Sequence, residues 1–367
     1  MDFLYSELDP RLLELKERIK LLLRIFQELL LRSNGDVEQA LEWLEILGER
    51  HHLFDARFGL AEFKELLEKN RTVARGSDGG LELTKKGERG LRLSSLEAIF
   101  SNLQRDAVGD HRVPATGIGH ERLPETRAYS FGDSIDLIAT NETLSNAIRR
   151  GGIEDISIEE EDLEVYETEH GSSCATVLMI DVSHSMILYG EDRITPAKRV
   201  ALALTELITT RYPKDSLDVV LFGDEAWQVP REELPYLGVG PFHTNTRAGL
   251  VLARDLLRKK RQANRQIFMI TDGKPSALTE RNGEIYKNPF GLDRRVVNKT
   301  LEEADACRRL GIPITSFMLT DDPVLVDFID TFTKTNRGRA YYSRPDDLGN
   351  FVLVDFLRNR RRRTRHG

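Results

Sequence analysis

The chain has 367 residues, with 53 Lys and Arg against 60 Asp and Glu, and a formal net charge of −7 at pH 7. At about 150 residues per domain, this length indicates roughly two domains and enough chain to bury a full core. The negative charge argues against a protein whose whole surface binds nucleic acid, although it leaves a local basic patch open. Cys174 and Cys307 lie far apart without a nearby Cys or His, which argues against a disulfide framework or a zinc ribbon.

The sequence has no targeting or membrane-spanning pattern. Its first residues include Asp2, Glu7 and Asp9 and lack the basic-then-apolar order of a signal peptide. The leucine-rich stretch at 21–31 is interrupted by charged residues and is too short to cross a bilayer. We therefore expect a cytoplasmic protein that does not enter a membrane.

Residues 1–110 are predicted to be mainly helical. Apolar residues recur at helical spacing over 12–30, 37–47 and 60–67, and again around 93–103. A glycine-rich turn at 75–80 precedes this last segment. Helices followed by a glycine-tipped hairpin loosely resemble a winged-helix unit, but a small helical bundle with one hairpin explains the same pattern and is favoured.

Residues 111–169 are predicted to be a connecting segment. Glycine and proline punctuate its first part, while apolar residues such as Tyr129 and Ile138 indicate packing against other parts of the protein. Residues 154–169 are strongly acidic and include no Lys or Arg. We interpret this stretch as a solvated edge strand or approach loop, with an acidic docking surface as the alternative.

Between residues 170 and 357, continuous apolar segments alternate with helical patterns. Strands are expected at 175–180, 217–222, 226–229, 266–270, 312–319 and 340–342, and helices at 195–211, 247–260, 296–310, 324–332 and 348–357. Thr195 is expected to be a helix N-cap with Pro196 in the first turn. This alternation predicts an α/β fold with a Rossmann-like, doubly wound and mainly parallel sheet.

Polar side chains occur where three segments of this sheet should meet. Asp181, Ser183 and Ser185 follow the first strand, Thr244 precedes the helix at 247–260, and Asp272 follows the strand at 266–270. Ligands of doubly wound sheets bind beyond the carboxyl ends of the strands. Carboxylate and hydroxyl oxygens without a thiolate suit Mg2+, or else Mn2+ or Ca2+. We predict a cation site that takes an acidic side chain from a partner protein as a further ligand.

Other interpretations of these residues are weaker. Helix capping and loop hydrogen bonds would account for single residues but not for three loops together. A hydrolase built from Ser185, His184 and Asp272 is disfavoured, because adjacent Ser and His rarely orient for proton transfer. No P-loop or Gly-x-Gly-x-x-Gly turn is present, so we expect a binding protein and not an enzyme.

The five residues resemble the metal-ion-dependent adhesion site of von Willebrand factor A (vWA) domains, which follows the order Asp-x-Ser-x-Ser, Thr, Asp. The resemblance covers about residues 170–357. It implies that Ser183, Ser185 and sometimes Thr244 contact the metal directly, whereas Asp181 and Asp272 act mostly through waters. His184 and His243 stand where that family often has glycine, and both could alter the rim of the site.

A helical N-terminal region followed by a vWA domain resembles intracellular bacterial proteins of the CoxE-like type. That resemblance implies a MoxR-family AAA+ ATPase as a partner, in assembly or remodelling of protein complexes. The alternative is a nucleic-acid-associated vWA protein that binds through its N-terminal region and the arginine-rich residues 358–367, which we predict to be a solvated basic tail.

Overall fold

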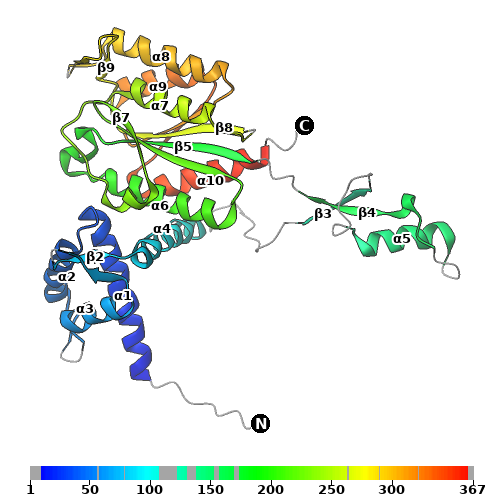
Figure 1. Ribbon diagram of the computed structural model, residues 1–367, viewed down its shortest axis with the longest axis horizontal. Coiled ribbons are helices and arrows are strands. Elements are labelled where there is room, and N and C mark those ends of the chain that lie inside the picture. Colours follow the sequence, from blue (N-terminus) through cyan, green and yellow to red (C-terminus); the bar gives the residue numbers. More distant parts are fainter. Residues whose placement is uncertain are drawn as a thin grey trace. The chain divides into compact units, whose positions relative to one another are not determined.

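The computed structural model describes residues 10–55, 58–77, 79–106, 122–129, 138–152, 157–168, 173–262, 264–288, 290–320 and 322–362 (Figure 1). The chain divides into two compact units. Met1–Gly109 and Ser173–Leu357 form the first unit, and Asp110–Ser172 with Arg358–Gly367 form the second. None of the described helices is long and apolar enough to cross a membrane.

A six-stranded sheet forms the centre of the first unit. Its strands are β5 (Cys174–Asp181), β6 (Ser216–Phe222), β7 (Ala226–Val229), β8 (Asn264–Thr271), β11 (Ile314–Met318) and β12 (Arg339–Tyr342). Their spatial order is β12-β11-β8-β5-β6-β7, and only the edge strand β7 is antiparallel to its neighbour. This order confirms the predicted doubly wound, mainly parallel α/β fold.

Helices cover both faces of the sheet (Figure 1). They are α6 (Ile194–Arg211), α7 (Thr246–Arg258), α8 (Arg294–Arg309), α9 (Pro323–Asn336) and α10 (Leu348–Arg362). Alternate side chains of β5 enter two separate cores, since Leu178 and Ile180 pack with α6 and α10, whereas Val177 and Met179 pack with α7, α8 and α9. Helix α10 continues to Arg362, into the segment expected to be a basic tail, and residues 363–367 lie outside the described residues.

The N-terminal region is helical with one hairpin, as predicted. It consists of α1 (Pro10–Arg32), α2 (Val37–His51), α3 (Leu60–Lys69), the antiparallel strands β1 (Val73–Arg75) and β2 (Leu81–Leu83), and α4 (Lys85–Asp106). Phe26, Leu41 and Phe63 belong to a core that these helices and the hairpin share. A winged-helix-like unit stays a prediction for this region.

Apolar residues of the N-terminal region also enter the core beneath the sheet. Leu31, Leu91 and Ile99 belong to the same buried cluster as the inward faces of α6 and α10. A Cβ atom added to Gly349 of α10 would lie 2.7 Å from Ile99 Cδ1, so glycine allows α4 to approach α10 closely. The N-terminal region and the sheet are therefore one packed body.

Lys198 of α6 makes a polar contact across the same boundary. The side chain is completely buried, and its Nζ donates to the carbonyl oxygens of Leu31 and Leu237 (3.0 Å to Leu237) and to Asn34 Oδ1 (2.8 Å). Burial lowers the pKa of Lys198 to about 8, although the nearby charge of Asp192 opposes this shift. The three acceptors match the three donors of an ammonium group.

The second unit has its own secondary structure where we expected a connecting segment. Strands β3 (Arg122–Ala128) and β4 (Glu164–Thr168) are antiparallel, and α5 (Thr140–Gly151) precedes a short 3-10 helix, η2 (Glu160–Asp162). Arg150 of α5 donates to both carboxylate oxygens of Asp162 (3.1 and 2.8 Å) and to Glu159 (2.8 Å). The hydrogen bond from Arg150 holds the pKa of Asp162 below its usual value. Part of the acidic stretch is thus paired inside this unit.

Candidate functional site

Four of the predicted site residues form a chain of side-chain oxygens at the carboxyl ends of β5 and β8. Ser183 Oγ lies 3.0 Å from Ser185 Oγ and 3.0 Å from Thr244 Oγ1. Ser185 Oγ donates to Asp272 Oδ1 at 2.8 Å. The structure therefore brings together residues that are far apart in the sequence, as the strand order of a parallel sheet requires.

Asp181, the fifth residue, is the last residue of β5 and is completely buried. Its Oδ1 accepts the backbone N–H of Ser183 (2.9 Å), and its Oδ2 accepts the hydroxyl of Thr271 (2.5 Å). Burial, together with the charge of Asp272, raises the pKa of Asp181 to about 7. Two buried carboxylates that disfavour each other's charge would both be stabilised by a cation placed near them.

Gly273 marks the point on which the oxygens converge. A Cβ atom added to this residue would lie 2.9 Å from Thr244 Oγ1, 3.1 Å from Ser185 Oγ and 3.4 Å from Asp181 Oδ2. Oxygens from three separate loops thus border one small space. Within the described residues, no group of three or more His, Cys, Asp or Glu side chains could hold a metal ion. The hydroxyl oxygens are therefore needed for a cation here, and such a donor set suits a hard ion.

The loop that carries Thr244 is held from several sides. Asn245 is the N-cap of α7 and accepts the N–H of Ala248 (3.1 Å), while its amide donates to Thr279 Oγ1 (2.9 Å). Ser276 Oγ accepts the backbone N–H of Thr244 (3.0 Å). These contacts fix the position of the Thr244 loop relative to the segment that follows Asp272.

Arg193 belongs to the site, and sequence reasoning missed it. Its guanidinium group donates to Asp272 Oδ2 and, at 2.7 Å, to Glu191 Oε2. No spacing or composition in the sequence distinguishes this arginine from the others. Thr271 was also missed, although its position directly before Asp272 at a strand end could have indicated it.

Helix α6, which follows the loop that contains Ser183 and Ser185, begins earlier than expected. Helix α6 starts at Ile194, and Thr195 is not its cap, because the backbone N–H of Thr195 donates to Asp192 Oδ1 (3.0 Å). An aspartate placed one turn before therefore replaces the expected threonine cap. The rest of the loop forms a 3-10 helix, η3 (His184–Gly190). The segment after Asp272 contains a hairpin of β9 (Ala277–Thr279) and β10 (Ile285–Lys287), where the sequence analysis predicted no strand.

The two histidines lie at the rim. His184 is exposed, and the backbone N–H of His243 donates to Asp224 Oδ1 (2.9 Å). Ser185 donates to Asp272 and not to an imidazole, which removes the geometric basis for a serine hydrolase built from Ser185, His184 and Asp272.

The sheet order and its helices define a vWA-type domain. Residues 174–357 match the family model described as "Rv0959-like protein, vWA domain", and residues 121–168 match "Rv0959-like protein, third domain". The chain belongs to this Rv0959-like family of vWA-domain proteins. The third-domain match coincides with the separate unit of β3, α5 and β4.

Relatives of this chain occur in mycobacteria. It is 36% identical over 316 residues to uncharacterized protein Rv0959 of Mycobacterium tuberculosis and to uncharacterized protein Mb0984 of Mycobacterium bovis, covering 84% of this chain and 46% of each relative. The chain thus spans less than half the length of these relatives. Among solved structures, it is similar to the PilB minor pilin of Streptococcus sanguinis (15% identity, 54% of this chain, 64% of that one, TM-score 0.42). It is also similar to the vWF domain of the Mfa5 pili tip protein of Porphyromonas gingivalis (13% identity, 52% of this chain, 96% of that one, TM-score 0.39).

Proposed function

We propose that this protein is a metal-dependent protein-binding module whose vWA domain takes Mg2+ at the five-residue site. The convergence of oxygens from three loops on the space beside Gly273 carries the proposal. Ser183, Ser185 and Thr244 would supply neutral oxygen ligands, and Asp181 and Asp272 would balance the ion's charge. Mn2+ and Ca2+ are the other ions that this donor set suits.

The charge balance of these residues favours an acidic partner. Three of the five side chains are neutral hydroxyls, and Asp272 is already engaged by Ser185 and Arg193. A bound divalent ion would offer a positive site to a carboxylate oxygen of another protein. A binding role, and not catalysis, is part of the same proposal, since the hydroxyl oxygens border one small space in which they can serve as ligands.

The resemblance to CoxE-like proteins suggests a partner protein and a cellular location. The vWA domain is a protein-interaction module, and we propose that its partner is a MoxR-family AAA+ ATPase or a client protein of such an ATPase, as in CoxE-like proteins. A cytoplasmic location is part of the same proposal. The hydroxyl-rich site is the surface that we assign to this contact.

Capture of partners in the presence and absence of metal tests the proposal. The immobilised chain should retain its partner in millimolar Mg2+ and release it in EDTA, and the Asp181→Ala variant should retain less than wild type in Mg2+ and no more than wild type in EDTA. Mass spectrometry of the eluates identifies proteins whose retention needs both the metal and Asp181. Equal retention by wild type and Asp181→Ala in both buffers would contradict a metal-dependent contact.

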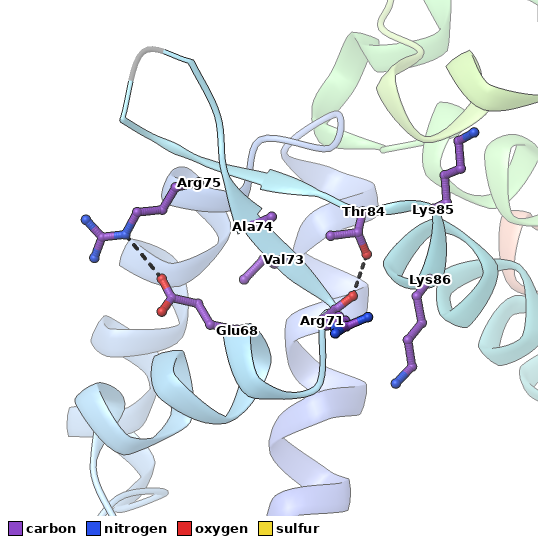
Figure 2. Close-up of a pocket in the computed structure, with 8 residues that line it drawn as sticks. All are labelled: Glu68, Arg71, Val73, Ala74, Arg75, Thr84, Lys85 and Lys86. Atoms are coloured by element: carbon purple, nitrogen blue, oxygen red, sulfur yellow. Dashed lines mark hydrogen bonds and ion pairs between the residues drawn. The ribbon is translucent and has the colours of Figure 1, made fainter.

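A second candidate function, nucleic-acid binding, is favoured by a basic pocket in the N-terminal region. The pocket has a volume of about 680 Å3 and lies between the end of α3, β1 and the start of α4 (Figure 2). Four cationic side chains border it, namely Arg71, Arg75, Lys85 and Lys86. Figure 2 shows Arg75 turned toward Glu68, with Nε 3.6 Å from its Oε1, while the two lysines extend to opposite sides of the first turn of α4. Acidic residues of α3, Glu62, Glu65 and Glu68, weaken this candidate because they would repel phosphates.

Salt dependence tests the second candidate. If the pocket binds phosphates, the affinity for a fluorescent DNA or RNA oligonucleotide should fall steeply with KCl, with a slope that reflects about three or four neutralised phosphates. Replacing Lys85 and Lys86 with glutamine should reduce that slope by about two. Anisotropy titrations between low and moderate salt measure both quantities. Oligonucleotide binding that is absent at low salt would rule this candidate out.

A further inference from the structure

The negative charge of Asp272 is balanced by a positively charged side chain of the same protein, Arg193. Among the described residues, Arg193 is the one cation in salt-bridge contact with either site carboxylate. Asp272 is fully buried and the Arg193 side chain is only 15% exposed, so water screens this contact weakly. One oxygen of Asp272 accepts from Ser185 and the other accepts from Arg193, so both of its oxygens are already engaged.

We infer that Arg193 is the resident cation of this site and competes with the divalent ion for Asp272, and that it therefore sets the metal affinity. This inference rests on the proposed function. A divalent ion beside Gly273 would bring a second concentrated positive charge close to the same carboxylate. The guanidinium group and the ion repel each other, so the contact between Arg193 and Asp272 weakens as the ion binds.

Glu191 gives Arg193 a second partner to hold. The Nε and Nη2 atoms of Arg193 donate to Glu191 Oε2 at 3.0 and 2.7 Å, while its Nη1 atom donates to Asp272. When Nη1 is released, the guanidinium group therefore keeps an ion pair and needs no new partner. The Glu191 side chain is 57% exposed, so it can follow the arginine toward solvent.

The backbone of Arg193 is bound to the loop that carries Ser183 and Ser185. It stands between η3 and the start of α6, and its backbone N–H donates to the carbonyl oxygen of Met186 (3.0 Å), within the turn that contains Ser183 and Ser185. The residue is thus anchored at its backbone, while its guanidinium group contacts Asp272 and Glu191 at once. A side chain that can give up one of two carboxylates while its backbone stays fixed is suited to tune affinity without altering the loop.

Arg193→Gln is the principal test. Calorimetric titration of this variant with Mg2+ should give an affinity about tenfold higher than wild type, the change expected for removing one charge-assisted hydrogen bond that the ion must break. In EDTA, the melting temperature of the variant should be lower than that of wild type, because Asp181 and Asp272 then lack a counter-charge. Arg199→Gln is the matched control, since Arg199 lies on α6, the helix that follows Arg193, but pairs with Glu28, and its Mg2+ affinity should equal that of wild type.

The Glu191→Gln variant tests whether Glu191 holds Arg193 when Arg193 leaves Asp272. Removing the alternative partner should leave Arg193 on Asp272 and weaken Mg2+ binding, whereas in the Arg193→Gln background the same change should have little effect. If wild type binds Mg2+ and Arg193→Gln binds it equally or more weakly, the inference is overturned while the proposed function stands. If wild type binds no divalent ion at all, both fail.

Discussion

Replacing Asp272 with alanine should weaken Mg2+ binding by about 10- to 100-fold, the loss typical when a carboxylate that orients the ligands of a metal is removed. Asp272 accepts the hydroxyl of Ser185, so its removal frees one of the neutral ligands as well as half of the site's negative charge. The fold should survive, because both apolar cores lie within the sheet and its helices. Calorimetric titration with Mg2+ and Mn2+ measures the affinity directly.

Thermal unfolding gives an independent readout of the same loss. A ligand that binds only the native state raises its stability by mass action, so millimolar Mg2+ should raise the melting temperature of wild type and that of Asp272→Ala much less. Gly273→Ala is a second variant that keeps every proposed ligand, yet its methyl group would fill the space beside Thr244 and Ser185. Asp327→Ala, on an exposed position of α9, is the control. Equal affinities in all four proteins would contradict the site.

Lys198→Met should destabilise the first unit by about 2–4 kcal/mol, because the buried carbonyl oxygens of Leu31 and Leu237 would lose their donor. Methionine keeps the length and the apolar part of the side chain, so the loss reports the ammonium contacts and not a cavity. Denaturant titration gives the free energy of unfolding. Lys214→Met, at an exposed lysine, should change that free energy by less than about 0.5 kcal/mol.

The pH dependence of stability gives a second check on Lys198. Burial lowers the pKa of Lys198 to about 8, from an ordinary value of 10.5. Between these two values the unfolded chain binds more protons than the folded chain, so the free energy of unfolding should rise as the pH increases. In Lys198→Met this contribution should vanish. An unchanged pH profile would contradict the lowered pKa of Lys198. A loss of stability no larger than that of Lys214→Met would show that the contacts of Lys198 do not stabilise the unit.

The sheet was predictable because its signals are local. Continuous apolar runs such as 175–180 are typical of strands that are buried on both faces, and helical segments between such strands indicate parallel crossovers. The Asp-x-Ser-x-Ser spacing marked one strand end, and the strand order implied that Thr244 and Asp272 would lie near it. The helical N-terminal region followed from apolar periodicity for the same reason.

The remaining features depend on tertiary contacts. Lys198 lies within α6 and Arg193 directly before it, and nothing nearby in the sequence marks Arg193 as the residue that reaches Asp272 or Lys198 as the one buried against Leu31. The paired strands β3 and β4 are separated by α5, and their short, polar sequences lack the alternation that would indicate a sheet. Each of these features depends on hydrogen bonds between residues that are distant in the chain.

The first unit is discontinuous in the chain, and this has a consequence for its synthesis. Leu91 and Ile99 of α4 belong to the same buried cluster as α6, but roughly 105 residues must be translated after Asp106 before α6 is complete at Arg211. At about 5–20 residues per second, the N-terminal region leaves the ribosome some 5–20 seconds before its neighbour. During that interval Leu91 and Ile99 lack the α6 surface that helps to bury them in the folded unit.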